Sequence, residues 1–270
     1  MLAVTSPPLS PSPLKERGIK GEGITKDAII KTMEKLNSGA KKLGLHLNPS
    51  QLEQFSIYYQ ELVDWNKRVN LTAITDYEEV QIKHFLDSLT VTIAWQLPIS
   101  NADFSLIDVG TGAGLPGIPL KIMFPNIRLV LLEATAKKAA FLHHLKQKLG
   151  LDNLEIVVGR AEAVAHLSEY RERFDIVLSR GVASLPTLVE LTLPFGTIGG
   201  SFIAQKKGEI EPEISQATKA ISTLGGSLRE VKRIELEEFT DQRQLIIIDK
   251  VSITPPQYPR RPGIPAKRPL

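Results

Sequence analysis

The chain has 270 residues, of which 42% are hydrophobic and 23% are charged, and its net charge is +3. This length suits one large domain or two small ones. The chain has no cysteine, which excludes disulfides, thiolate metal sites and a cysteine nucleophile. No apolar run approaches the ~20 residues that a membrane helix needs, and the N-terminus lacks the apolar core of a secretory signal. We therefore expect a cytoplasmic protein.

The charge is unevenly distributed along the chain. Residues 1–26 hold four basic and two acidic residues and residues 255–270 hold four basic and no acidic ones, which leaves residues 27–254 with a net charge of −3. The composition of residues 1–24 predicts a disordered extension, and that of 255–270 predicts a basic, proline-rich tail. An argument for nucleic-acid binding must therefore rest on particular cations and not on the overall charge.

Two helices are predicted before the first strand. Asn48 is a suitable N-cap, with Pro49 at the first helical position and Gln51 three residues after the cap. A second helix is predicted over residues 78–95, because its apolar residues recur at helical spacing. We expect these helices to form an N-terminal helical segment, residues 25–101, that packs on the main domain.

From residue 102 onward, short apolar runs alternate with helical segments. Several runs are apolar without alternation, as in buried parallel strands. The pattern predicts an α/β fold over residues 102–254, with a mostly parallel twisted sheet and helices on both faces. Strands are predicted at 104–109, 128–133, 154–158, 174–178, 201–204 and 244–251, and helices at 116–123, 137–149, 163–170 and 185–194.

The strongest chemical signal is the segment from Leu106 to Gly117, which reads LIDVGTGAGLPG. A buried strand enters a loop with Gly110, Gly112 and Gly114 at alternate positions, and a helix follows. Such a loop lets a ligand approach backbone N–H groups at the carboxyl edge of the sheet. Glu133 ends the next strand, where an acidic residue commonly binds ribose hydroxyls.

Two ligands compete for this loop. The spacing of Gly112, Gly114 and Gly117 satisfies the dinucleotide fingerprint, so a nicotinamide-dependent oxidoreductase stays open. Asp108 favours S-adenosylmethionine instead, because a carboxylate there could place an ammonium group but is poorly placed beside a pyrophosphate. Pro116 also removes one N–H that an anion would use. A tight turn without a ligand is the structural alternative.

Two further strand ends carry polar residues. Gly159, Arg160, Ala161 and Glu162 follow the third predicted strand, where an acid could meet an adenine ring. Ser179 and Arg180 follow the fourth. An enzyme that methylates an exocyclic amine would be expected to carry an Asn/Asp-Pro-Pro-aromatic loop after that strand. This sequence has no such loop there.

These residues resemble the RsmG family, also called GidB, of guanine-N7 methyltransferases of small-subunit (16S) ribosomal RNA. The resemblance covers nearly all of residues 45–270 and rests on motifs at 69–74, 84–89, 108–119, 137–142, 160–162, 179–180, 206–208 and 258–263 and on Glu133. It implies a Rossmann-like class I methyltransferase fold. It also implies that the methyl-donor contacts fall on Gly110, Leu115, Glu133, Ala134, Thr135, Ala161, Glu162 and Arg180.

The residue inventory agrees with methylation of guanine N7, which needs no general base because N7 carries no proton. RNA would be held by local cations. The residues that we expect to bind it are Arg180, Lys206, Lys207, Arg243, Arg260 and Arg261. A solvated turn at 206–207 and a solubilising tail are the structural alternatives. A non-catalytic RNA-binding factor for ribosome assembly is the second functional alternative. The expected partner is 16S rRNA or the small ribosomal subunit, and the expected state is a monomer.

His84, Asp87 and Ser88 suggest a catalytic triad at first sight. Residues three and four apart on one helix cannot reproduce the geometry in which nucleophile, base and orienting acid converge from separate elements. The neighbouring pair His143 and His144 lacks the spaced carboxylates of a metal site. We therefore predict neither a triad nor a bound metal.

Overall fold

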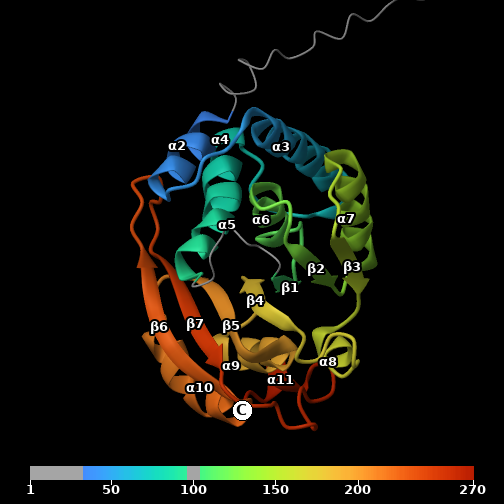
Figure 1. Cartoon of the computed structure of the whole chain (residues 1–270), viewed down its shortest axis with the longest axis vertical. Coiled ribbons are helices and arrows are strands. Elements are labelled where there is room, and N and C mark those ends of the chain that lie inside the picture. Colours follow the sequence, from blue (N-terminus) through green and yellow to red (C-terminus); the bar gives the residue numbers. More distant parts are fainter. Residues whose placement is uncertain (1–32, 96–103) are drawn as a thin grey trace, which may run out of the picture.

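A seven-stranded sheet forms the centre of the protein in a computed structural model, which describes residues 33–95 and 104–270 (Figure 1). The predicted extension at 1–24 and the link at 96–103 lie outside the described residues. The strands are β1 (Ser105–Val109), β2 (Arg128–Glu133), β3 (Leu154–Val158), β4 (Phe174–Arg180), β5 (Gly196–Lys207), β6 (Gly226–Ile234) and β7 (Arg243–Lys250).

The strand order is β3-β2-β1-β4-β5-β7-β6. The first five strands are parallel, whereas β7 is antiparallel to both of its neighbours. The chain runs outward from β1 to β3 and then returns to the other side of β1 as β4. This reversal opens a crevice at the carboxyl ends of β1 and β4, where open α/β sheets bind their ligands.

Helices cover both faces of the sheet. Figure 1 shows α2 to α7 above the sheet and α8 to α11 below it. The upper helices are α2 (Glu34–Lys42), α3 (Pro49–Val69), α4 (Tyr77–Val80), α5 (Asp87–Leu89), α6 (Gly117–Met123) and α7 (Ala136–Leu149). The lower ones are α8 (Ala161–Val164), α9 (Leu185–Thr192), α10 (Glu211–Thr223) and α11 (Ile264–Lys267). Adjacent residues of β1 show the two layers, since Leu106 packs in the upper core and Ile107 in the lower one.

The N-terminal helices are fixed to the sheet domain by their side chains. The predicted capping box at Asn48 and Gln51 is present and begins α3. Gln51 also donates to the carbonyl of Ile122, at 2.9 Å, and Gln54 to that of Leu149, at 2.8 Å. These carbonyls lie at the ends of α6 and α7, so α3 satisfies acceptors that a helix end leaves free.

The structure corrects several predicted element bounds. The helix predicted at 78–95 is α4, a π-helix (η1, Gln81–Leu86), α5 and a 3-10 helix (η2, Thr90–Ala94) in succession. The helix predicted at 163–170 is the short α8, and the one at 185–194 is α9 followed by a 3-10 turn (η4, Leu193–Phe195). The strand β6 was missed because it is an edge strand whose interior residues are partly or fully exposed, so it shows no apolar run. The helices α2, α10 and α11 were also not predicted.

Candidate active site

The glycine-rich loop joins β1 to α6 at the carboxyl edge of the sheet. Gly110, Gly112 and Gly114 have φ values of +73°, +61° and +93°, which residues with a side chain rarely adopt. A Cβ on Gly112 would have no non-neighbouring atom of the described chain within 4 Å, whereas one on Gly114 would lie 2.5 Å from Ile118 Cδ1. Gly112 thus borders open space, and Gly114 lets the loop pack against α6.

Asp108 supports this loop from beneath. Its side chain is fully buried, and Oδ2 accepts hydrogen bonds from the Thr111 hydroxyl at 2.7 Å and the Gly117 N–H at 2.9 Å. Burial raises the pKa of the Asp108 carboxyl to about 6, although both hydrogen bonds act to lower it. Oδ1 has no hydrogen-bond partner among the described residues. The carboxylate therefore holds the loop closed and keeps one acceptor unused.

Glu133 reaches the same loop from the end of β2. Its Oε2 accepts from the Gly112 N–H at 3.0 Å, and its Oε1 accepts from the Thr135 N–H at 2.7 Å. The side chain is buried. The two loops that follow β1 and β2 are thus joined by one carboxylate.

A pocket of about 500 Å³ opens above these loops. It brings together seven of the predicted cofactor residues, which are Gly110, Gly112, Leu115, Glu133, Ala134, Thr135 and Arg180. Its wall also contains residues that the sequence reasoning did not assign to the site, among them Thr72, His84, Lys138 and Val182. Thr72 and His84 belong to motifs of the family resemblance, which was the available signal for them.

A smaller cavity of about 90 Å³ adjoins the pocket and shares Gly110 and Ala134 with it. Ala161 and Glu162, the remaining predicted contacts on the third strand end, line this cavity. A larger hollow of about 730 Å³ lies near the amino ends of β2 and β3, where parallel sheets do not carry their ligand sites. Asp108 and Gly114 line neither cavity near the loop and act through the loop backbone.

Glu162 connects this region to the C-terminal segment. Its Oε1 accepts from Arg160 Nη2 and from the Gly263 N–H, both at 3.0 Å. Burial acts to raise the pKa of Glu162, but these two hydrogen bonds, together with the charge of Arg160 and the backbone N–H of Glu162 itself, hold the pKa below its ordinary value. The predicted tail is therefore in contact with the site.

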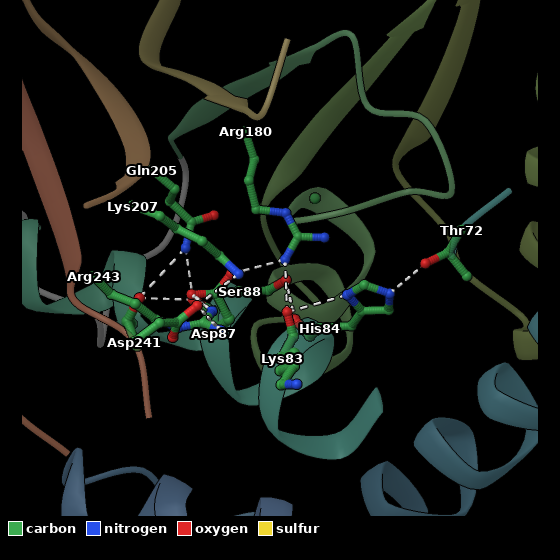
Figure 2. Close-up of polar contacts among 12 residues, drawn as sticks. Thr72, Lys83, His84, Asp87, Ser88, Arg180, Gln205, Lys207, Asp241 and Arg243 are labelled. Carbon is green, nitrogen blue, oxygen red and sulfur yellow. Dashed lines mark hydrogen bonds and ion pairs between the residues drawn. The ribbon is translucent and has the colours of Figure 1, made fainter. Parts of the chain in front are cut away.

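Arg180 reaches the pocket from the end of β4 and is held by a carboxylate outside it. Its Nη1 donates to Asp87 Oδ2 at 2.9 Å. The other oxygen of Asp87 pairs with Arg243, which also pairs with Asp241 at 2.7 Å, and Asp241 pairs with Lys207 at 2.9 Å. Figure 2 shows this chain of alternating charges, which brings together residues from β4, α5, β7 and β5.

His84 faces the pocket as a neutral side chain. Burial and the charge of Arg180 lower its pKa to about 4. Its Nε2 lies 2.8 Å from the Thr72 hydroxyl, and the Ser88 hydroxyl donates to the His84 carbonyl, not to the ring. Asp87 binds arginines instead of the imidazole, so these side chains have separate structural partners.

Comparisons with known proteins now place the chain in a family. Residues 51–246 match the sequence model of GidB, described as rRNA small subunit methyltransferase G. The chain belongs to this family. A Dehalococcoides mccartyi (strain BAV1) protein named ribosomal RNA small subunit methyltransferase G is 53% identical over 88% of this chain and 100% of its own length. The protein of the same name from Moorella thermoacetica is 48% identical over 86% of this chain and 95% of its own.

Membership of the GidB family confirms the predicted family, methyltransferase activity and cofactor class, and the sheet confirms the predicted fold class. Neither the oxidoreductase nor the non-catalytic alternative receives support. Among solved structures, a geranyl diphosphate methyltransferase has a TM-score of 0.49 and 11% identity, over 76% of this chain and 100% of its own.

The cations predicted to bind RNA are mostly engaged within this GidB-family chain. Lys206, whose side chain is 11% exposed, pairs with Glu213 at 2.8 Å and donates to the Ala183 carbonyl at 2.7 Å. The Arg243 side chain is 3% exposed and lies between Asp87 and Asp241. These side chains stabilise the fold, and an RNA phosphate would have to displace their carboxylate partners.

The cations of the C-terminal segment differ from one another. Arg260 forms hydrogen bonds with both carboxylate oxygens of Glu190, whereas the exposed Arg261 has no ion pair in the described part of the chain. Lys207 pairs with Asp241 but keeps 53% of its side chain exposed. Of the six predicted RNA contacts, Lys207 and Arg261 are thus the most accessible, and Arg180 faces the pocket.

Within residues 33–95 and 104–270, no helix is long and apolar enough to cross a membrane. In the same residues, no cluster of three or more His, Asp or Glu side chains could hold a metal ion.

Proposed function

We propose that this chain transfers a methyl group from S-adenosylmethionine to N7 of a guanine in 16S ribosomal RNA. The observation that carries the proposal is the pocket of about 500 Å³ in which Glu133 and Gly112 meet beside Arg180. Its position at the carboxyl ends of β1, β2 and β4 is where a Rossmann-like sheet binds a nucleoside, and the chain is a member of a family of rRNA methyltransferases.

The residues present fit this cofactor. Glu133 lies where a carboxylate can accept from ribose hydroxyls, and the smaller cavity at Ala161 and Glu162 would take the adenine. The backbone of Gly110, Gly112 and Leu115 would hold the amino-acid end. Asp108 Oδ1, a buried acceptor without a hydrogen-bond partner in the described chain, adds negative charge near that end.

The reaction needs no acid–base catalysis by the side chains of the protein. A bound S-adenosylmethionine would supply a sulfonium methyl; the N7 lone pair would form the new C–N bond as the C–S bond breaks, and the electron pair of that bond would remain on sulfur. Since N7 bears no proton, no general base is required, and His84, whose pKa is lowered to about 4, would be a weak one. The work of the chain is to align the two reactants and to exclude water.

RNA is held, on this proposal, by accessible cations around the pocket. Lys207 and Arg261 are suited to bind phosphates because their side chains are exposed, and Lys138 lines the pocket itself. Lys206, Arg243 and Arg260 support the surface through their carboxylate partners. We expect the protein to act on this substrate in the cytoplasm and as a monomer.

A methylation assay tests the proposal. The purified protein is incubated with S-adenosylmethionine and either deproteinised 16S rRNA or small subunits from cells that lack the activity, and N7-methylguanine is mapped by chemical cleavage. We expect a single new N7-methylguanine. Calorimetry should show binding of S-adenosylhomocysteine but not of NADH. Binding of NADH, or no methylation of either substrate, would refute the proposal.

A further inference from the structure

Arg180 offers unused hydrogen-bond donors to the pocket. Its Nη1 is committed to Asp87 Oδ2, at 2.9 Å, and approaches the Lys83 carbonyl at 3.4 Å. The side chain is only 17% exposed, yet Nη2 and Nε make no hydrogen bond to the described chain. A guanidinium that is held at one nitrogen and free at the others can bind a ligand in a fixed orientation.

Asp87 is itself held on several sides. Its side chain is buried, its second oxygen pairs with Arg243, and its backbone carbonyl accepts from Gln205 Nε2 at 2.6 Å. The preceding turn of helix, Gln81–Leu86, is a π-helix, a conformation that occurs frequently at functional sites. Figure 2 shows Arg180 extending from β4 toward the helix that carries Asp87 and His84.

We propose that Asp87 positions Arg180 so that its free guanidinium nitrogen donates to O6 of the target guanine and thereby selects guanine over adenine. The inference rests on the proposed N7 methylation. In guanine the atom beside N7 is the acceptor O6, whereas adenine presents an amino donor there. A guanidinium next to N7 therefore attracts guanine and repels adenine.

The Asp87 carboxylate also reduces an unfavourable electrostatic interaction between Arg180 and the reacting guanine. The guanine ring gains positive charge during the transfer, and an unpaired guanidinium beside it would oppose that charge. Asp87 offsets the charge of Arg180, and Arg243 and Asp241 continue the alternation away from the pocket. Arg180 can thus act as a hydrogen-bond donor with a smaller electrostatic cost to the reaction.

A double-mutant cycle between protein and RNA tests this pairing. A 16S rRNA fragment carries either guanine or 2-aminopurine, which keeps N7 but lacks O6, at the methylated position. Methylation rates and RNA dissociation constants, the latter with S-adenosylhomocysteine bound, are measured for the wild type and Arg180→Lys. Guanine N7 is intrinsically a better nucleophile than N7 of 2-aminopurine, so both proteins should prefer guanine to some extent. The test is therefore whether the ratio of the guanine rate to the 2-aminopurine rate differs between the wild type and Arg180→Lys.

We expect the wild type to prefer guanine over 2-aminopurine by about tenfold to a hundredfold more than Arg180→Lys does, because the single ammonium group of lysine would pair with Asp87 and leave no second nitrogen for O6. An equal preference in both proteins would overturn the inference. A wild type that forms no N7-methylguanine on the guanine fragment would instead refute the proposed function, so the two failures are distinguishable.

The positioning role of Asp87 needs its own variant. Asp87→Asn should reduce guanine preference as Arg180→Lys does and lower kcat, while the dissociation constant of S-adenosylhomocysteine stays within about threefold. Asp64→Asn, which removes an exposed carboxylate of α3 that pairs with Lys67 and Arg68, is the matched control and should change neither quantity. A folded Asp87→Asn protein with full guanine preference would contradict the positioning role. If that variant does not fold, Asp87→Glu, which retains the carboxylate, replaces it and should retain at least part of the guanine preference; a folded Asp87→Glu protein that has none would contradict the positioning role.

Discussion

Arg260 and Glu190 form a bidentate ion pair that attaches the C-terminal segment to α9. Arg260 Nε and Nη2 donate to the two carboxylate oxygens at 2.9 and 2.6 Å, the Arg260 N–H donates to Oε1 at 2.8 Å, and the Glu190 side chain is fully buried. A segment whose composition suggests a solvated tail is thus part of the folded structure.

Loss of Arg260 should therefore reduce stability. Arg260→Ala leaves the buried Glu190 carboxylate without its partner, and we expect the free energy of unfolding to fall by about 3 kcal/mol. The neighbouring Arg261→Ala is the control, with a change within ~0.5 kcal/mol, and it should instead weaken RNA binding and flatten its salt dependence. Urea unfolding and RNA titrations at several salt concentrations measure both, and equal stability losses in the two variants would contradict this assignment.

Glu162 should couple the C-terminal segment to cofactor binding. Glu162→Gln weakens the hydrogen bonds from Arg160 and Gly263, so we expect S-adenosylhomocysteine to bind about tenfold more weakly and residues 255–270 to become more sensitive to protease. Glu169→Gln, an exposed glutamate away from the cavity, should leave both properties unchanged. A protease-sensitive segment combined with unchanged affinity would show that the two are independent.

Asp108 should make stability depend on pH in an unusual direction. Its pKa is about 6 in the folded protein against an ordinary 3.8, so the folded state keeps a proton that the unfolded state has lost between these values. The contribution is fully present below pH 3.8 and is lost as pH rises through 6, by about 3 kcal/mol. The difference in unfolding free energy between wild type and Asp108→Asn, measured from pH 4 to 7, isolates this effect; a difference that does not vary with pH contradicts it.

Removal of the Glu133 carboxylate should greatly weaken cofactor binding. Glu133→Ala deletes the acceptor shared by Gly112 and Thr135, and we expect the affinity for S-adenosylhomocysteine to fall at least about a hundredfold, with no ligand-induced rise in Tm. Glu78→Ala, on the exposed surface of α4, should retain the full rise. A normal rise in Glu133→Ala would exclude Glu133 from the site.

The sequence predicted the parts of the structure that depend on local pattern. The glycine loop from Gly110 to Gly114 and the acid at Glu133 were found because each follows a buried strand, and parallel strand ends meet at one edge. The π-helix over Gln81–Leu86 was not found, because apolar spacing does not distinguish a π turn from an α turn. The edge strand β6 was missed because its interior residues are at least partly exposed to solvent.

Ion pairs between distant elements account for what the sequence could not show. Lys206, Arg243 and Arg260 each looked like a free cation, but Glu213, Asp87 and Glu190 lie on other elements and neutralise them. The same limit concealed Asp87 as the partner of Arg180. Only the register of the sheet and the packing of α5, α9 and α10 around it bring these charges together.

The modification state of 16S rRNA in cells is the most direct test of the proposed methylation. N7-methylguanine is quantified in 16S rRNA from cells that lack this chain and from the same cells supplied with the wild type or with Glu133→Ala at matched protein levels. The proposed activity predicts that one N7-methylguanine is absent without the protein, is restored by the wild type and is not restored by the variant. An N7-methylguanine content that is the same in all three would contradict it.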